Sequence, residues 1–136
     1  MAYLIDTDVA IHLRDGNADV TAKIGALDDA VLMSIVTRVE LEGGVYRVPA
    51  QASVRRARLD VILKAIPALA FDDAAADAYG AIVGHAGYSR VGHAGYSRRK
   101  LLDRMIAAQA LVHRSTLVTM NGPDYADIPN LKLLVW

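Results

Sequence analysis

Two kinds of segment alternate along the chain: short apolar runs and longer stretches in which apolar residues have helical spacing. Runs such as AYLI and TLVT have the length and composition of buried strands. Between such runs, apolar residues recur three or four positions apart, as at Leu59, Ile62 and Ile66, which is typical of an amphipathic helix. The pattern predicts five strands, at Ala2–Ile5, Ala30–Ser34, Ala68–Phe71, Thr116–Thr119 and Leu131–Val135.

Helices are predicted in the segments that separate these strands. An alanine-rich helix follows Asp72 or Asp73, either of which can cap it. Strands that alternate with helices imply an α/β fold with a parallel sheet covered on both faces. No linker interrupts the pattern, so residues 1–136 are expected to form a single domain. The other predicted helices are Thr7–Arg14, Val20–Leu27, Thr37–Tyr46, Val54–Ile66 and Leu101–His113.

An eight-residue sequence occurs twice in succession, because VGHAGYSR fills positions 83–90 and again 91–98. A unit this short that occurs twice does not make a repeat protein. Its glycines disfavour a continuous helix. We interpret 83–98 as a tandem duplication whose second copy is an inserted loop, and its histidines, His85 and His93, as loop residues rather than ligands.

Composition narrows the possible functions. Hydrophobic residues make up 54% of the 136 residues, which is enough for a packed core and argues against disorder. The formal net charge is zero, so any binding of nucleic acid must come from local patches. The absence of cysteine excludes disulfides and thiolate metal sites. With neither a basic signal sequence nor an apolar run long enough for a membrane span, a cytoplasmic protein is expected.

Acidic and amide side chains follow the predicted strands. Asp6 follows the first strand, and Glu40 lies about one turn into the helix after the second. Asp103 is expected in the first turn of a later helix, and Asn121 and Asp124 come after the fourth strand. The carboxyl ends of parallel strands share one edge, so these side chains are expected to gather there. Crowded carboxylates repel one another without a cation, and hard oxygen ligands favour Mg²⁺ or Mn²⁺.

Each of these residues also has a purely structural interpretation. Asp6 or Thr7 fits a helix cap. Glu40 fits a capping box, in which its side chain would bond back to the backbone of Thr37. Asp103 would complement a helix dipole, and the segment NGPD is a plain turn sequence. The metal site is therefore predicted from the joint position of the residues and from no single one.

Basic residues cluster just before and after Asp103. Cations beside an acidic metal centre suit a phosphodiester substrate, with the cations on backbone phosphates and the metal at the scissile one. A solvated, charged loop is the alternative, above all for Arg90 and Arg98. The residues predicted to contact RNA phosphates are Arg98, Arg99, Lys100 and Arg104.

Four segments together resemble the PIN-domain ribonucleases, specifically the VapC-type toxins of toxin–antitoxin pairs. They are LIDTDVAIHL, SIVTRVELEGG, LLDRMIAAQAL and LVTMNGPDYADIPNL, and they run from end to end of the chain in family order. The resemblance implies a PIN-like fold, a homodimer and inhibition by a small VapB-like antitoxin. It also implies an acidic site of Asp6, Glu40 and Asp103, with Asn121 or Asp124 as a fourth member. The duplicated octapeptide departs from the family because it lengthens the segment that leads into Asp103.

The resemblance further implies a Mg²⁺-dependent endoribonuclease, with Mn²⁺ as a substitute. Asp6 and Asp103 would hold the metal, and Glu40 would bind it or orient the attacking water. The metal would polarise the phosphate and lower the pKa of that water. Three neighbouring side chains are expected to support the site by hydrogen bonds: Thr7, Asp8 and Thr119.

Two other classes of protein remain possible from the residues alone. DTD after a strand also resembles the haloacid-dehalogenase phosphatases, in which Asp6 would be a covalent nucleophile. Ala10, four positions later, does not fit that signature, and a receiver domain is a weaker variant of the same idea. The third possibility is a non-catalytic PIN-like binding module whose acids only cap helices. Such a module would not bind manganese tightly, so a metal titration separates it from an enzyme.

Overall fold

Five parallel strands form one sheet at the centre of the protein. The computed structural model describes residues 1–84 and 98–136. The strand order is β3-β2-β1-β4-β5, so the first strand lies in the middle of the sheet. All the pairings are parallel, as the alternation of strands and helices predicts. The strands are β1 (Tyr3–Ile5), β2 (Val31–Ser34), β3 (Ala68–Leu69), β4 (Thr116–Thr119) and β5 (Leu133–Val135).

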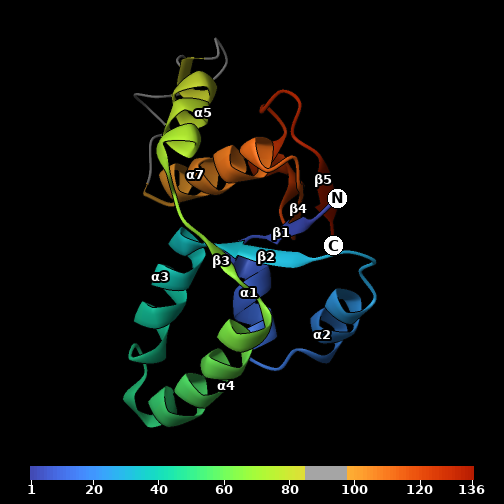
Figure 1. Cartoon of the computed structure of the whole chain (residues 1–136). Coiled ribbons are helices and arrows are strands. Elements are labelled where there is room, and N and C mark those ends of the chain that lie inside the picture. Colours follow the sequence, from blue (N-terminus) through green and yellow to red (C-terminus); the bar gives the residue numbers. More distant parts are fainter. Residues whose placement is uncertain (85–97) are drawn as a thin grey trace.

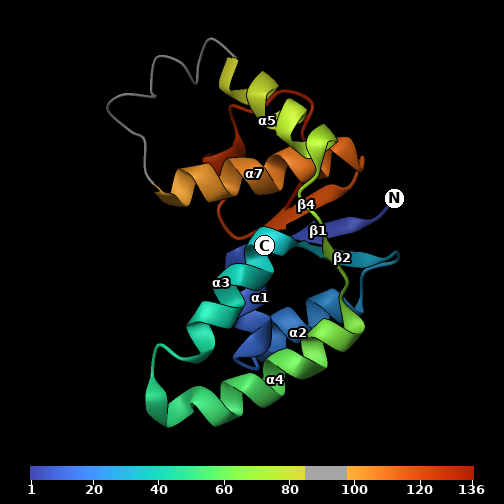
Figure 2. The ribbon, with the colours of Figure 1, turned by 60° about the vertical axis from the view of Figure 1, so that its left-hand side comes forward.

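Helices cover both faces of the sheet (Figure 1). The first four lie on one side of the sheet, and α5 and α7 lie together on the other side, as the turned view in Figure 2 also shows. The α-helices are α1 (Thr7–Arg14), α2 (Ala18–Gly25), α3 (Ile35–Val45), α4 (Ala52–Ala65), α5 (Asp73–Gly84) and α7 (Arg98–Val112). Two short 3₁₀ helices are η1 (Pro49–Gln51) and η2 (Gly122–Tyr125).

Two hydrophobic cores lie on opposite faces of the sheet. Successive strand residues point to opposite faces, and Leu4 accordingly packs in the core under α5 and α7, whereas Ile5 packs in the core with α1 to α4. Leu117 and Val118 divide between the two cores in the same way. A strand buried on both faces has no polar alternation, which is why these strands are continuous apolar runs in the sequence.

Helix starts are fixed by side chains that accept backbone N–H groups. Asp72 accepts from the N–H of Ala75 at 3.0 Å, so Asp72 is the cap of the alanine-rich α5. The predicted start of α3 at Thr37 is wrong. The Ser34 hydroxyl accepts from the N–H of Val36 at 2.9 Å, and the helix begins at Ile35. The capping-box interpretation therefore does not hold, because Thr37 lies inside the helix.

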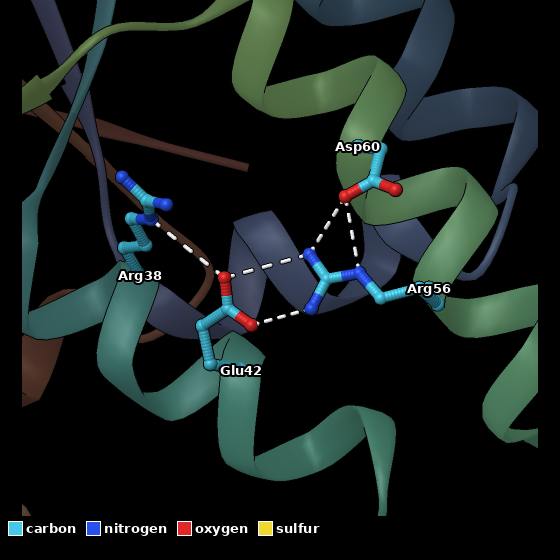
Figure 3. Close-up of polar contacts among 4 residues, drawn as sticks. All are labelled: Arg38, Glu42, Arg56 and Asp60. Atoms are coloured by element: carbon cyan, nitrogen blue, oxygen red, sulfur yellow. Dashed lines mark hydrogen bonds and ion pairs between the residues drawn. The ribbon is translucent and has the colours of Figure 1, made fainter.

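Ion pairs join α3 to α4 on the protein surface (Figure 3). The Arg56 guanidinium donates to Glu42 of α3 and to Asp60 of its own helix. Arg38, one turn before Glu42, lies 3.7 Å from the same carboxylate. Hydrogen bonding with Arg56 is the main reason why the pKa of Glu42 lies below its usual value. These contacts tie α4 to the helix that carries Glu40.

The segment before Asp103 differs from the prediction in one respect. α7 begins at Arg98, so Asp103 lies in the second turn of this helix and not in the first. The predicted inserted loop falls mainly on residues 85–97, which lie outside the described residues, as do Arg90, His85 and His93. Within residues 1–84 and 98–136, no helix is long and apolar enough to cross a membrane.

Candidate active site

The carboxyl ends of β1, β2 and β4 meet at one edge of the sheet. In the register of the central strands, Ile5 pairs with Met33 on one side and with Val118 on the other. The next residue of each strand, namely Asp6, Ser34 and Thr119, is therefore level with the other two. Parallel pairing thus brings the ends of these three strands to one edge of the sheet.

Asp6 is buried and uses its two oxygens for different purposes. Only 4% of the residue is exposed. Oδ1 accepts from the N–H of Val9 at 3.1 Å, which makes Asp6 the cap of α1. Oδ2 accepts from the Tyr125 hydroxyl at 3.4 Å. Burial raises the pKa of Asp6 despite stabilising hydrogen bonds from Thr119 and Val9, so the carboxylate is short of favourable charge around it.

Tyr125 connects Asp6 with Asp103. It comes from η2 and is 1% exposed. Its hydroxyl, which has a single proton, lies 3.4 Å from Asp6 Oδ2 and also interacts with the Asp103 carboxyl group. Burial first, and then the charges of Asp6 and Asp103, raise the pKa of Tyr125, which keeps the phenol protonated as a donor. The structure thus brings the two predicted acids to one shared hydroxyl group. Sequence reasoning missed Tyr125, although it directly follows Asp124 in the segment GPDY.

Glu40 lies at the mouth of the same region. Its Oε1 accepts from the Thr7 hydroxyl at 2.7 Å, and that hydroxyl lies 3.0 Å from the hydroxyl of Thr37. The predicted hydrogen-bonding role of Thr7 is therefore present, and it is directed at Glu40. Glu40, Asp103 and Asp8 line a cleft of about 840 Å³.

The three expected metal ligands do not converge on one point. Among residues 1–84 and 98–136, no three His, Asp or Glu side chains are arranged closely enough to hold a metal ion together. Asp6 and Asp103 share Tyr125, whereas Glu40 is held by Thr7. The structure therefore assembles a carboxylate pair and a third acid beside it, rather than a three-carboxylate cage.

Asn121 and Asp124 contact each other at the end of β4. The Asn121 amide donates to Asp124 Oδ2 at 2.8 Å, and the backbone N–H of Asn121 donates to the hydroxyl of Thr119 at 3.0 Å. Thr119 in turn hydrogen-bonds Asp6, in the supporting role expected of it. Asn121 is exposed and Asp124 is half-buried, so this turn forms a polar rim above Thr119.

The residues predicted to contact RNA differ in how the structure places their side chains. The structure does not describe the side chains of Arg98 and Arg99. Lys100 is half-buried. Arg104 is held by an ion pair. Arg104 is 4% exposed, and its guanidinium donates to both oxygens of Asp127, at 2.7 and 3.0 Å. A bidentate pair of this kind holds η2 and the following turn against α7, and it commits both Nη atoms of Arg104 to one carboxylate.

Three other arginines line the cleft instead. They come from α1, from the turn after α3 and from the first turn of α4, and the sequence pattern did not single them out. No local spacing marks them, since the packing of α3 and α4 against α1 decides which side chains face the cleft. They are Arg14, Arg47 and Arg55.

Comparison with known proteins identifies the family. The PIN domain model matches residues 3–131. Ribonuclease VapC2 of Rickettsia felis is 23% identical over 139 residues, which cover 100% of this chain and 98% of the relative. Among solved structures, VapBC2 from Rickettsia felis bound to a DNA fragment from their promoter aligns with a TM-score of 0.83 at 22% identity, over 100% of this chain and 99% of that one.

A second structure shares the fold at slightly higher identity. FitAcB from Neisseria gonorrhoeae is 26% identical with a TM-score of 0.77, over 97% of this chain and 96% of that one. The phosphatase and receiver-domain interpretations are therefore wrong. Since the family model matches all but a few terminal residues, this chain belongs to the PIN domain family.

Proposed function

We propose that the protein is a metal-dependent endoribonuclease and the toxin of a type II toxin–antitoxin pair. The observation that carries the proposal is the pairing of Asp6 and Asp103 on Tyr125, at the carboxyl edge of a parallel sheet beside a cleft. In a PIN domain that resembles a ribonuclease over its whole length, this pair is the natural site for cleavage of a phosphodiester.

The donor set suits Mg²⁺. This ion keeps several waters and is usually bound by one or two carboxylates together with substrate phosphates, not by a cage of protein ligands. Two carboxylates, Asp6 and Asp103, are what the site offers. Because Oδ1 of Asp6 is committed to the cap of α1, Oδ2 is the oxygen that would face the metal. A cation there would supply the positive charge that buried Asp6 lacks.

The bound metal would polarise the phosphate and make the attacking water more acidic. The chain's own residues would position the reactants. Tyr125 would hold the carboxyl groups of Asp6 and Asp103 at a fixed separation. The Thr7 hydroxyl occupies one oxygen of Glu40, which leaves the other to orient the water or to accept its proton. Asn121 or Asp124, at the rim, would be the fourth polar group near the substrate.

We propose the partners from the relatives and from the surface. The similarity to the solved VapBC2 of Rickettsia felis favours a small VapB-like antitoxin as the partner. We further propose that the protein forms a homodimer and acts in the cytoplasm. The protein surface around α3, η1 and α4 exposes large apolar side chains, which is typical of surfaces that bind other proteins. They are Val39, Tyr46, Val48, Val54 and Val61.

Cleavage of mixed cellular RNA in Mg²⁺, and its loss in EDTA, is the expected result of the direct test. Mn²⁺ should restore activity after chelation, whereas Ca²⁺ should restore less, because Ca²⁺ prefers more ligands and longer bonds. Gel analysis of the RNA fragments is the measurement. Equal cleavage in EDTA would contradict metal dependence, and no cleavage with any ion would favour the non-catalytic binding module.

Tyr125→Phe is expected to lower kcat about tenfold with KM unchanged. The ring still fills the core, but Asp6 and Asp103 lose the hydroxyl that they share, and a hydrogen bond to a charged group is worth about 1.5–3 kcal/mol. Tyr3→Phe is a matched control, since it also removes a phenol–carboxylate hydrogen bond, to Asp28, but at the opposite end of β1. Steady-state kinetics at saturating Mg²⁺ is the measurement. An unchanged kcat would remove Tyr125 from the site.

A further inference from the structure

Arg14 is a buried cation in the cleft. Its side chain is 5% exposed, although it ends α1. The same cleft is lined by Glu40 and Asp103, and by two further arginines, Arg47 and Arg55. Burying a charge costs free energy unless an opposite charge or hydrogen-bonding group pairs with it. The contacts of Arg14 therefore show which of its donors remain for a ligand.

Among the described residues, hydrogen-bond partners are found on only one side of the Arg14 guanidinium. Nε and Nη2 both donate to the same oxygen, Oδ1 of Asp15, at 3.1 Å each. Asp15 is the next residue in the chain, and its side chain is 47% exposed. Neither bond uses Nη1, so the fork that could bind a second anion is turned away from Asp15.

Gly44 makes the space for that side of the guanidinium. A Cβ at position 44 would lie 2.7 Å from Arg14 Nη1, closer than carbon and nitrogen approach without bonding. Gly44 lies in α3 and is buried. Its carbonyl accepts from Arg55 Nη1 at 2.8 Å, and Arg55 Nε has no hydrogen-bond partner among the described residues. Two guanidinium groups thus converge on this short stretch of α3 backbone.

We propose that Arg14, seated by Gly44, binds a phosphate of the RNA strand next to the one that is cleaved. The inference rests on the proposed ribonuclease function and assigns a substrate contact within that site. A planar guanidinium whose Nη1 makes no hydrogen bond with the described residues matches phosphate oxygens. The cleft is lined by acids, which would face the metal, and by arginines, which would face the strand.

Arg14→Gln tests the contact because it keeps the first three carbons of the side chain and a polar end but removes the charge. KM for a short RNA should rise at least tenfold, with kcat within about threefold of the wild-type value. The salt dependence is the sharper measurement. Each phosphate contact with a single strand contributes about −0.7 to the slope of log affinity against log salt concentration, so the variant should lose about that much.

Gly44→Ala tests whether the space beside Gly44 positions the Arg14 guanidinium, without removing a charge. The atom that it would contact is the far end of a flexible side chain, so the guanidinium moves and the fold is retained. KM and the salt slope should shift in the direction seen for Arg14→Gln. Gly80→Ala is the matched control, because it adds the same methyl group inside α5, where no atom of another described element lies within 4 Å. This control should leave both values unchanged.

Binding of a non-cleavable 2′-deoxy strand, measured by fluorescence anisotropy, separates this inference from the proposed function. If the wild-type protein binds the strand but cleaves no RNA, the ribonuclease proposal fails, and the Arg14 contact is still tested by the change in Kd. If Arg14→Gln and Gly44→Ala keep the wild-type Kd, KM and salt slope, the Arg14 inference is overturned even for an active nuclease.

Discussion

Replacement of Asp103 by asparagine is expected to lower kcat/KM for RNA cleavage about a thousandfold while the protein stays folded. Such a loss corresponds to about 4 kcal/mol of transition-state stabilisation, which is reasonable when a metal ligand is removed. Asp6→Asn should have a similar effect, because asparagine still caps α1 but carries no charge toward the metal. Kinetics on a defined RNA in Mg²⁺ provides the measurement.

The same substitutions should not destabilise the metal-free protein. Asp6 is buried with a raised pKa, and both carboxylates lie near one phenol, so a neutral amide relieves desolvation and repulsion. Melting temperatures without metal should therefore be equal to or above that of the wild type. Asp19→Asn is the charge-matched control, since this acid is exposed on α2 and forms an ion pair with Lys23 on the same helix. Full activity of Asp103→Asn would exclude the proposed site.

Much of the fold could be predicted because single residues set the boundaries of the elements. α1 spans Thr7–Arg14 and β4 spans Thr116–Thr119, as predicted, since an acid cap begins the first and a run of apolar residues defines the second. α3 begins two residues earlier than predicted. Both Ser34 and Thr37 are competent caps, and the choice between them depends on where β2 ends, which the sheet decides.

The site could be predicted only in part, for a related reason. Parallel strands determine that residues after β1 and β4 share an edge, so the placement of Asp6 follows from the pattern. The roles of Arg14 and Arg104 do not follow from it. Each is an arginine near the end or the middle of a helix, and tertiary packing alone buries Arg104 against Asp127 and turns Arg14 into the cleft. The basic cluster around Asp103 marked Arg104 as an RNA contact, and no local pattern marked Arg14.

Asp6 shows why a structural and a functional interpretation of one residue need not compete. The cap of α1 uses Oδ1, and the bond from Tyr125 uses Oδ2. Because the cap fixes the rotamer of the carboxylate, it also fixes the direction of the second oxygen. The helix start thus positions the group that is proposed to bind metal, which explains why an acid that caps a helix directly after a central strand is a useful site residue.

The largest expected effect on stability comes from Leu59→Ala. Leu59 is fully buried on α4 and packs in the core with Ile5, Met33 and Leu41, where its loss leaves a cavity between the helix and the sheet. Truncations of this kind cost about 2–5 kcal/mol. For a domain of this size, a loss of about 3 kcal/mol lowers the melting temperature by about 10 °C.

Val61→Ala, two residues along the same helix, is the matched control. Val61 is 68% exposed, so its truncation removes little buried area, and alanine is the better helix former. Urea unfolding should therefore give a lower midpoint for Leu59→Ala with an unchanged m-value, and a midpoint within error of the wild type for Val61→Ala. Because α4 also carries Arg55, catalysis by the folded fraction of Leu59→Ala reports whether this helix must be held firmly for the cleft to work. Equal midpoints for the two variants would mean that α4 does not pack on the sheet as described.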